Sequence, residues 1–146
     1  MNILVSACLL GVSCRYDGRS KPDARVQKLM AQHNLIPVCA EIFGGLPTPR
    51  KPAERQGERV VTADGSDVTA AYQRGAEEVL RLAKLYGAKC AILKERSPSC
   101  GSGIIHNGHF DGGLTEGWGI TAALLQRNGI QVYGESEIDH LPSECI

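Results

Sequence analysis

Short apolar runs alternate with helical segments along this chain, and this alternation restricts the possible folds more than any other feature of the sequence. The segments expected to form strands are 2–7, 35–39, 89–94 and 130–133, and those expected to form helices are 23–33, 67–86 and 115–128. Strands that alternate with helices favour a parallel sheet with helices on its faces. We therefore predict an α/β fold, a single-domain Rossmann-like or flavodoxin-like sandwich with a mostly parallel sheet.

The segment 67–86 gives the strongest helical pattern. Its apolar residues recur every three to four positions, and this stripe includes Tyr72 and Gly75. Such spacing predicts an amphipathic helix that packs its apolar face on the sheet. Asp67 is expected to cap the start of this helix, and Gly87 to end it.

The remaining segments contain turn and loop signals. Pro37 predicts either an edge position or a short strand for 35–39, because proline lacks the N–H that a central strand donates. The segment 41–52 is rich in glycine and proline, so we expect a rigid loop without regular structure. Asp64-Gly65 and Asn107-Gly108 predict hairpin turns, the first of them joining 59–62 to 67–69.

Length and charge limit the classes of function. The chain has 146 residues, of which 42% are apolar, and 16 basic side chains balance 16 acidic ones. One domain over 1–146 is expected, with its core at about 2–134 and a polar, fraying C-terminal tail at 135–146. A neutral chain argues against a nucleic-acid polymer or an anionic membrane as the partner. The first residues are typical of a strand and not of a signal peptide, which favours a cytoplasmic location.

Three of the six cysteines follow predicted strands. Cys8 comes directly after the first strand, Cys39 ends the second, and Cys100 lies in the loop after the third. Ligands of open α/β sheets bind at the carboxyl ends of the strands, so these three thiols are expected to meet in one crevice. Because cytoplasmic thiols stay reduced, a disulfide framework is not expected.

The other three cysteines fall elsewhere in the pattern. Cys90 is near the start of the third strand and is predicted to be a core residue, while Cys145 in the tail is predicted to be incidental. Cys14 lies in the loop after the first strand, from which it could also reach the crevice.

Three thiolates without a clear fourth are consistent with two kinds of metal centre. One is zinc with an open coordination position. The other is an iron–sulfur cluster with one iron left free for substrate. CxxC pairs are absent and the four histidines are scattered, which disfavours structural zinc. The residues alone leave the choice between the two open centres undecided.

Two polar residues are placed next to these cysteines. Ser97 precedes Cys100 by three positions in the tight Ser-Pro-Ser-Cys-Gly loop, and Glu41 follows Cys39 by two. Either side chain could face the crevice and exchange protons, or could instead cap its own loop or face solvent. No Ser-His-Asp order suggests a hydrolase triad.

A set of motifs spread over roughly residues 2–134 resembles a domain-of-unknown-function family whose characterised members are thiouracil desulfidases. The motifs are Ser6–Gly11 (SACLLG), Cys14–Gly18 (CRYDG), Cys39–Glu41 (CAE), Gly44–Arg50 (GGLPTPR) and Ser97–Gly101 (SPSCG). Ala40 stands where members of the family often have proline. This departure could loosen the turn but removes no functional group.

The resemblance implies a [4Fe-4S] cluster held by Cys8, Cys39 and Cys100, a cofactor that air can remove or replace. It implies that the fourth iron is open and receives the sulfur of a thiolated base. Cys14 as a fourth ligand is the alternative. Glu41 and Ser97 match positions that look catalytic in the family.

The activity implied is non-redox C–S bond cleavage on a small thiolated base such as thiouracil, without a nucleic-acid polymer or membrane partner. Glu41 would activate water and Ser97 would shuttle a proton or bind the substrate. Arg15, Asp17 and Arg50 are predicted substrate contacts. The alternatives are a non-catalytic metal- or sulfide-sensing domain and a metal-free transferase with Cys100 as its nucleophile.

Overall fold

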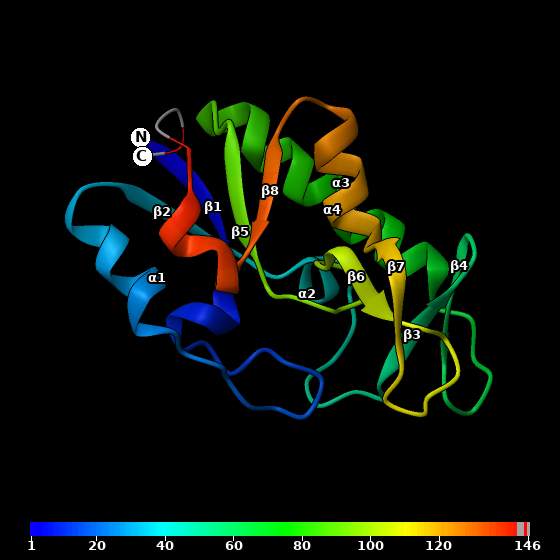
Figure 1. Cartoon of the computed structure of the whole chain (residues 1–146). Coiled ribbons are helices and arrows are strands. Elements are labelled where there is room, and N and C mark those ends of the chain that lie inside the picture. Colours follow the sequence, from blue (N-terminus) through cyan, green and yellow to red (C-terminus); the bar gives the residue numbers. More distant parts are fainter. Residues whose placement is uncertain (143–144, 146) are drawn as a thin grey trace.

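A four-stranded parallel sheet forms the centre of the protein (Figure 1). The computed structural model describes residues 1–142 and 145. The strands are β1 (Asn2–Ser6), β2 (Asn34–Val38), β5 (Cys90–Leu93) and β8 (Gln131–Gly134). They are arranged in the order β2-β1-β5-β8, and each neighbouring pair is parallel. This order is that of the first four strands of a flavodoxin-like sheet, which confirms the predicted fold class.

Helices cover both faces of this sheet. They are α1 (Ala24–Lys28), α2 (Ala40–Phe43), α3 (Thr69–Tyr86) and α4 (Ile120–Arg127), with the 3₁₀ helices η1 (Ala7–Leu10), η2 (Leu29–Ala31) and η3 (Glu135–His140). The helices α3 and α4 contribute to one core cluster, together with Leu4 of β1. The other cluster joins Ile3 and Val5 of the same strand to Val26 of α1, on the opposite face (Figure 1). Successive side chains of a central strand thus enter different cores, because a strand alternates its faces.

Local signals set several helix ends. Asp23 accepts hydrogen bonds from the backbone N–H groups of Arg25 and Val26 and so caps α1 as expected. Gly87 ends α3 in the left-handed conformation, with a φ of 62°. The helix α3 begins at Thr69 with Val68 as its N-cap residue, so the prediction of Asp67 as the N-cap was wrong. The Asp67 carboxylate still accepts a hydrogen bond from the Thr69 N–H at 2.9 Å.

Two hairpins lie outside the central sheet. The second has the predicted Asn107-Gly108 in its loop, whereas the first has another main partner strand than predicted. The first pairs β3 (Ala53–Gln56) with β4 (Arg59–Thr62), so the strand 59–62 pairs mainly with the residues before it. Its predicted partner segment supplies a single bridge, between Val61 and Asp67. The second hairpin pairs β6 (Ser102–His106) with β7 (Leu114–Trp118). The prediction of helix from residue 115 was therefore wrong, since α4 begins only at Ile120.

Side chains of β3 bind the two hairpins to each other. The Glu54 carboxylate accepts a hydrogen bond from the Gly108 N–H at 2.9 Å, and the Gln56 amide donates to the Gly108 carbonyl at 2.8 Å. Arg55 donates to the carbonyl oxygen of Trp118. Residues far apart in the chain therefore form one layer beside the sheet.

The C-terminal segment packs on the domain where it is described. Ile138 of η3 and the buried Leu141 join the core cluster on the α1 face, so the expectation of a fraying tail is wrong for 135–142. Cys145 is fully buried and forms a disulfide with Cys90, although it was predicted to be incidental. Residues 143, 144 and 146 of the predicted tail lie outside the described residues. Within the described part of the chain, no helix is long and apolar enough to cross a bilayer.

Candidate functional site

The carboxyl ends of β1, β2 and β5 bring the three expected cysteines to the same edge of the sheet. Cys8 lies in η1 immediately after β1, and Cys39 is the N-cap residue of α2 immediately after β2. Cys100 lies in the loop between β5 and β6. The segment 41–52 was predicted to lack regular structure, but its first residues belong to α2, which places Glu41 in the first turn of a helix.

Cys14 joins these three residues, and the four free thiols of the chain form what we call the cysteine group: Cys8, Cys14, Cys39 and Cys100. The Cys14 thiol lies close enough to the thiols of Cys39 and Cys8 for both of them to shift its pKa. The Cys39 thiol also lies 3.8 Å from the Cys14 carbonyl oxygen. Cys100 is close enough to Cys39 and Glu41 for their charges to act on its thiol.

The surroundings of Cys14, Cys39 and Cys100 favour the protonated form of their thiols. The hydrogen bond with Cys14 and burial raise the pKa of Cys39 well above its usual range. Burial and the charge of Glu41 raise the pKa of Cys100 to about 12. For Cys14, the hydrogen bond with Cys39 lowers the pKa, but the hydrogen bond with Cys8 and burial outweigh it and the pKa is raised. Metal binding at these thiols must therefore release protons, because thiolates are the ligands.

Hydrogen bonds hold the Cys100 loop in place. The Ser97 hydroxyl oxygen accepts from the backbone N–H groups of Ser99 at 3.1 Å and Cys100 at 2.6 Å. The Ser99 and Thr121 hydroxyls lie 3.0 Å apart and tie the loop to α4. Ser97 thus caps its own loop, and its O–H hydrogen stays available to a further acceptor.

Glu41 is held at both carboxylate oxygens. The Arg50 guanidinium donates to Oε2 at 2.8 Å, and the Tyr72 hydroxyl donates to Oε1. The side chains of Glu41 and Arg50 are 19% and 5% exposed. The charge of Glu41 acts on both Cys39 and Cys100, so this carboxylate lies beside the cysteine group.

The three predicted substrate contacts lie in different surroundings. Arg50 donates to Glu41 and to the Cys14 carbonyl oxygen at 2.8 Å, while its buried Nε has no protein partner. Asp17 is exposed and accepts from the Arg19 N–H, and the Arg15 guanidinium lies 5.9 Å from the Tyr16 ring centre. The Arg50 N–H donates to the Tyr16 carbonyl oxygen, which joins the Arg15–Asp17 turn to the site by its backbone.

Two side chains of this site were missed by sequence reasoning. Tyr72 was assigned only to the apolar stripe of its helix, and a tyrosine inside a buried stripe of small residues was the available signal. Ser6 is 3% exposed, and its hydroxyl donates to the Cys100 sulfur over 3.7 Å. It precedes Cys8 by two positions, the same spacing as that between Cys39 and Glu41.

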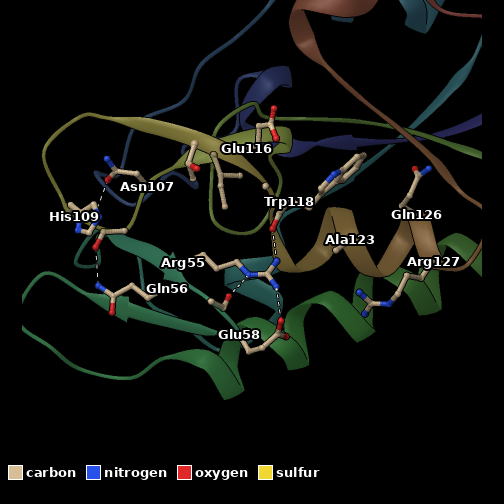
Figure 2. A pocket seen from close by; sticks show the side chains of 15 residues that line it. Arg55, Gln56, Glu58, Asn107, His109, Glu116, Trp118, Ala123, Gln126 and Arg127 are labelled. Atoms are coloured by element: carbon tan, nitrogen blue, oxygen red, sulfur yellow. Dashed lines mark hydrogen bonds and ion pairs between the residues drawn. The ribbon is translucent and has the colours of Figure 1, made fainter.

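A cavity of about 910 Å³ lies apart from the cysteine group, between the two hairpins and α4 (Figure 2). Its lining includes Arg55, Trp118 and Arg127 but none of the predicted site residues. Figure 2 shows the Arg55 side chain extending between Glu58, with which it forms an ion pair, and the Trp118 carbonyl oxygen, to which it donates a hydrogen bond. Its guanidinium is therefore engaged in holding the two hairpins together.

The arrangement of the thiols distinguishes a site for a single metal ion from a site for an iron–sulfur cluster. Within residues 1–142 and 145, no group of three or more Cys, His, Asp or Glu side chains is arranged to hold one metal ion. A four-iron cluster requires a wider arrangement of thiols, because each thiolate binds its own iron and the sulfurs need not converge on a single point.

Comparisons with known proteins agree with the geometry. The family model of the 2-thiouracil desulfurases matches residues 3–137. The uncharacterized protein YbbK of Bacillus subtilis (strain 168) is 44% identical, over 95% of this chain and 99% of its own length. The solved structure of TudS, described as a [4Fe-4S]-dependent thiouracil desulfidase, has a TM-score of 0.91 and 54% identity, over 96% of this chain and 94% of that one. The chain belongs to the 2-thiouracil desulfurase family.

Proposed function

We propose that this protein is a [4Fe-4S]-dependent desulfidase that replaces the sulfur of a small thiolated base, such as thiouracil, by oxygen. Water supplies the oxygen atom, the C=S bond becomes C=O, and the sulfur leaves as sulfide with the protons of the water. No electrons are gained or lost in this exchange. The family membership and the 54% identity to TudS support this assignment.

The observation that carries the proposal is the position of Glu41 beside the cysteine group at the carboxyl edge of the sheet. Cys8, Cys39 and Cys100 are the proposed ligands, one from the end of each of three strands. These residues fit an iron–sulfur cluster. Thiolates are its usual ligands, and the Ser6 hydroxyl already donates a hydrogen bond to the Cys100 sulfur. The buried Nε of Arg50 has no protein partner and is a further donor near the thiols. When bound, the cluster supplies a Lewis acid at the iron that no cysteine ligates.

Glu41 and Ser97 are the proposed catalytic residues. Each carboxylate oxygen of Glu41 uses one lone pair on its protein donor and keeps another, with which it can take a proton from water. The Ser97 oxygen is turned to two backbone N–H groups, so this hydroxyl is oriented to donate its hydrogen. Arg15, Asp17 and Arg50 remain proposed substrate contacts, with Arg50 also holding Glu41.

The surroundings of the thiols weigh against a metal-free cysteine nucleophile. A nucleophilic cysteine needs a lowered pKa, which nearby positive charge usually provides. Burial and the Glu41 carboxylate act in the opposite direction on Cys100, whose pKa rises to about 12. A sensing domain would bind the same cluster without converting a substrate, so an assay of substrate conversion separates it from an enzyme. We place the activity in the cytoplasm, because four of the six cysteines are free thiols and thiols stay reduced in that compartment.

The test is anaerobic reconstitution with iron and sulfide, followed by incubation with 2-thiouracil. The expected results are about four irons per chain, a brown visible absorption, and uracil and sulfide released in equal amounts. Other thiopyrimidines and thiopurines in the same assay define the substrate class. A protein that binds the cluster but converts none of these bases is a sensor. Conversion by protein free of iron would support the metal-free alternative.

A further inference from the structure

Helices α2 and α3 approach each other closely beside Glu41. A Cβ atom added to Gly75 of α3 would lie 1.8 Å from the Ala40 carbonyl oxygen, and one added to Gly44 would lie 2.0 Å from the Ala71 carbonyl oxygen. Only glycine fits at both positions, so α2 and α3 touch backbone to backbone. Ala40 immediately precedes Glu41 and Ala71 immediately precedes Tyr72. The contact of the two helices therefore brings Tyr72 to Glu41.

Tyr72 contributes a single polar atom to this contact. The side chain is 2% exposed, and its hydroxyl donates to Glu41 Oε1. Burial and the neighbouring charge of Glu41 raise the pKa of Tyr72 far above its usual range, so the hydroxyl remains a donor throughout the neutral pH range. The other buried residues of α3 are glycine, alanine and valine, so Tyr72 supplies the polar side-chain group of this buried face.

Arg50 acts on the other oxygen of the same carboxylate. It approaches from the loop after α2, whereas Tyr72 approaches from α3, so the two donors fix Glu41 from two independent elements. A carboxylate held at one oxygen can still rotate about its side-chain bonds. Donors on both oxygens leave it one orientation, which is how catalytic groups are held close to their productive geometry.

We propose that Tyr72 is a positioning residue for the desulfidase reaction, one that fixes the orientation of Glu41 beside Cys39 and Cys100. The inference rests on the proposed function, because it assigns to Tyr72 a part in the same reaction. Tyr72 acts through Glu41 and does not itself touch the substrate.

The test is a double-mutant cycle of Tyr72→Phe and Glu41→Gln on reconstituted protein. Tyr72→Phe removes only the hydroxyl, and it should keep the iron content and visible spectrum, lower kcat roughly tenfold and leave KM within about twofold. In the Glu41→Gln protein the same change should have no further effect on kcat, because the oriented carboxylate is already gone. Tyr86→Phe is the matched control, on an exposed residue at the far end of the same helix.

Other results of this experiment would contradict either the positioning role of Tyr72 or the proposed function. An unchanged kcat in Tyr72→Phe, or an equal loss in the presence and absence of the Glu41 carboxylate, overturns the positioning role while the desulfidase assignment stands. Loss of iron from Tyr72→Phe but not from Tyr86→Phe makes Tyr72 a structural residue and also overturns it. A wild-type protein that holds its cluster and releases no sulfide from any thiolated base overturns the proposed function and the role of Tyr72 with it.

Discussion

Ser6 precedes Cys100 by 94 residues, yet its hydroxyl lies 3.7 Å from the Cys100 sulfur and donates to it. The same oxygen accepts a hydrogen bond from the Lys94 N–H at 2.9 Å, just beyond the end of β5. One small hydroxyl thus joins the end of β1 to the start and the middle of the loop that carries Cys100. The position of this sulfur depends on the central sheet as well as on its own loop.

Replacing Ser6 by alanine should weaken both connections. The half-buried Lys94 N–H would lose its acceptor, so we expect the free energy of unfolding to fall by about 1–2 kcal/mol. Urea denaturation under reducing conditions measures this change, and Ser13→Ala, in an exposed loop position, is the control. A midpoint equal to that of the control would show that a water molecule or another group replaces the hydroxyl.

Glu41→Gln keeps the size of the side chain but removes its basic oxygen. We expect iron content to stay constant and kcat to fall by roughly 10² or more, the usual loss when a general base is removed. Glu58→Gln is a suitable control, because that side chain is 96% exposed. Full activity in Glu41→Gln would mean that water is activated without this carboxylate.

Two substitutions separate the possible roles of Ser97. Ser97→Ala should lower turnover by roughly 10² at constant iron content if the hydroxyl handles a proton. Ser97→Thr keeps the oxygen that accepts from Ser99 and Cys100 and should retain most activity. If Ser97→Ala instead loses iron and regains activity on reconstitution, the hydroxyl only caps the Cys100 loop.

Cys14→Ser tests whether the cluster has three ligands or four. The Cys14 backbone is held by Arg50, and serine can preserve the hydrogen bonds of the thiol. We expect a four-iron cluster and at least part of the activity to remain, because Cys8, Cys39 and Cys100 are still present. Iron analysis and electron paramagnetic resonance measure the cluster type. A three-iron or iron-free protein would identify Cys14 as the fourth ligand.

The sheet and the meeting of the cysteines could be predicted because each depends on a strong local signal. The strands are apolar runs of four to five residues, and the rule that ligands bind at strand ends places Cys8, Cys39 and Cys100 together without further information. The edge position of β2 is one of the two alternatives that Pro37 predicts. The ligand roles themselves remain predictions from the family resemblance.

The elements that were missed are short and depend on tertiary contacts. The helix α2 has four residues, and it is stabilised where Gly44 packs against α3, a contact that a Gly-Pro-rich sequence hides. The sequence predicts the Asn107-Gly108 turn but places the start of a helix where β7 lies, because the loop of this hairpin extends over seven residues and the pairing of β7 with β6 depends on tertiary context. Cys145 could not be placed because its disulfide partner is 55 residues away.

The hairpins β3–β4 and β6–β7 are bonded to each other but share no ladder with the central sheet. One follows the segment that carries Arg50, and the other follows Cys100 directly. Units of this kind open locally at a lower free energy than that of global unfolding. The rate at which air bleaches the loaded protein should therefore follow the opening of the hairpins, seen as amide hydrogen exchange in 53–62 and 102–118. A protein of high melting temperature could then still be short-lived outside an anaerobic chamber.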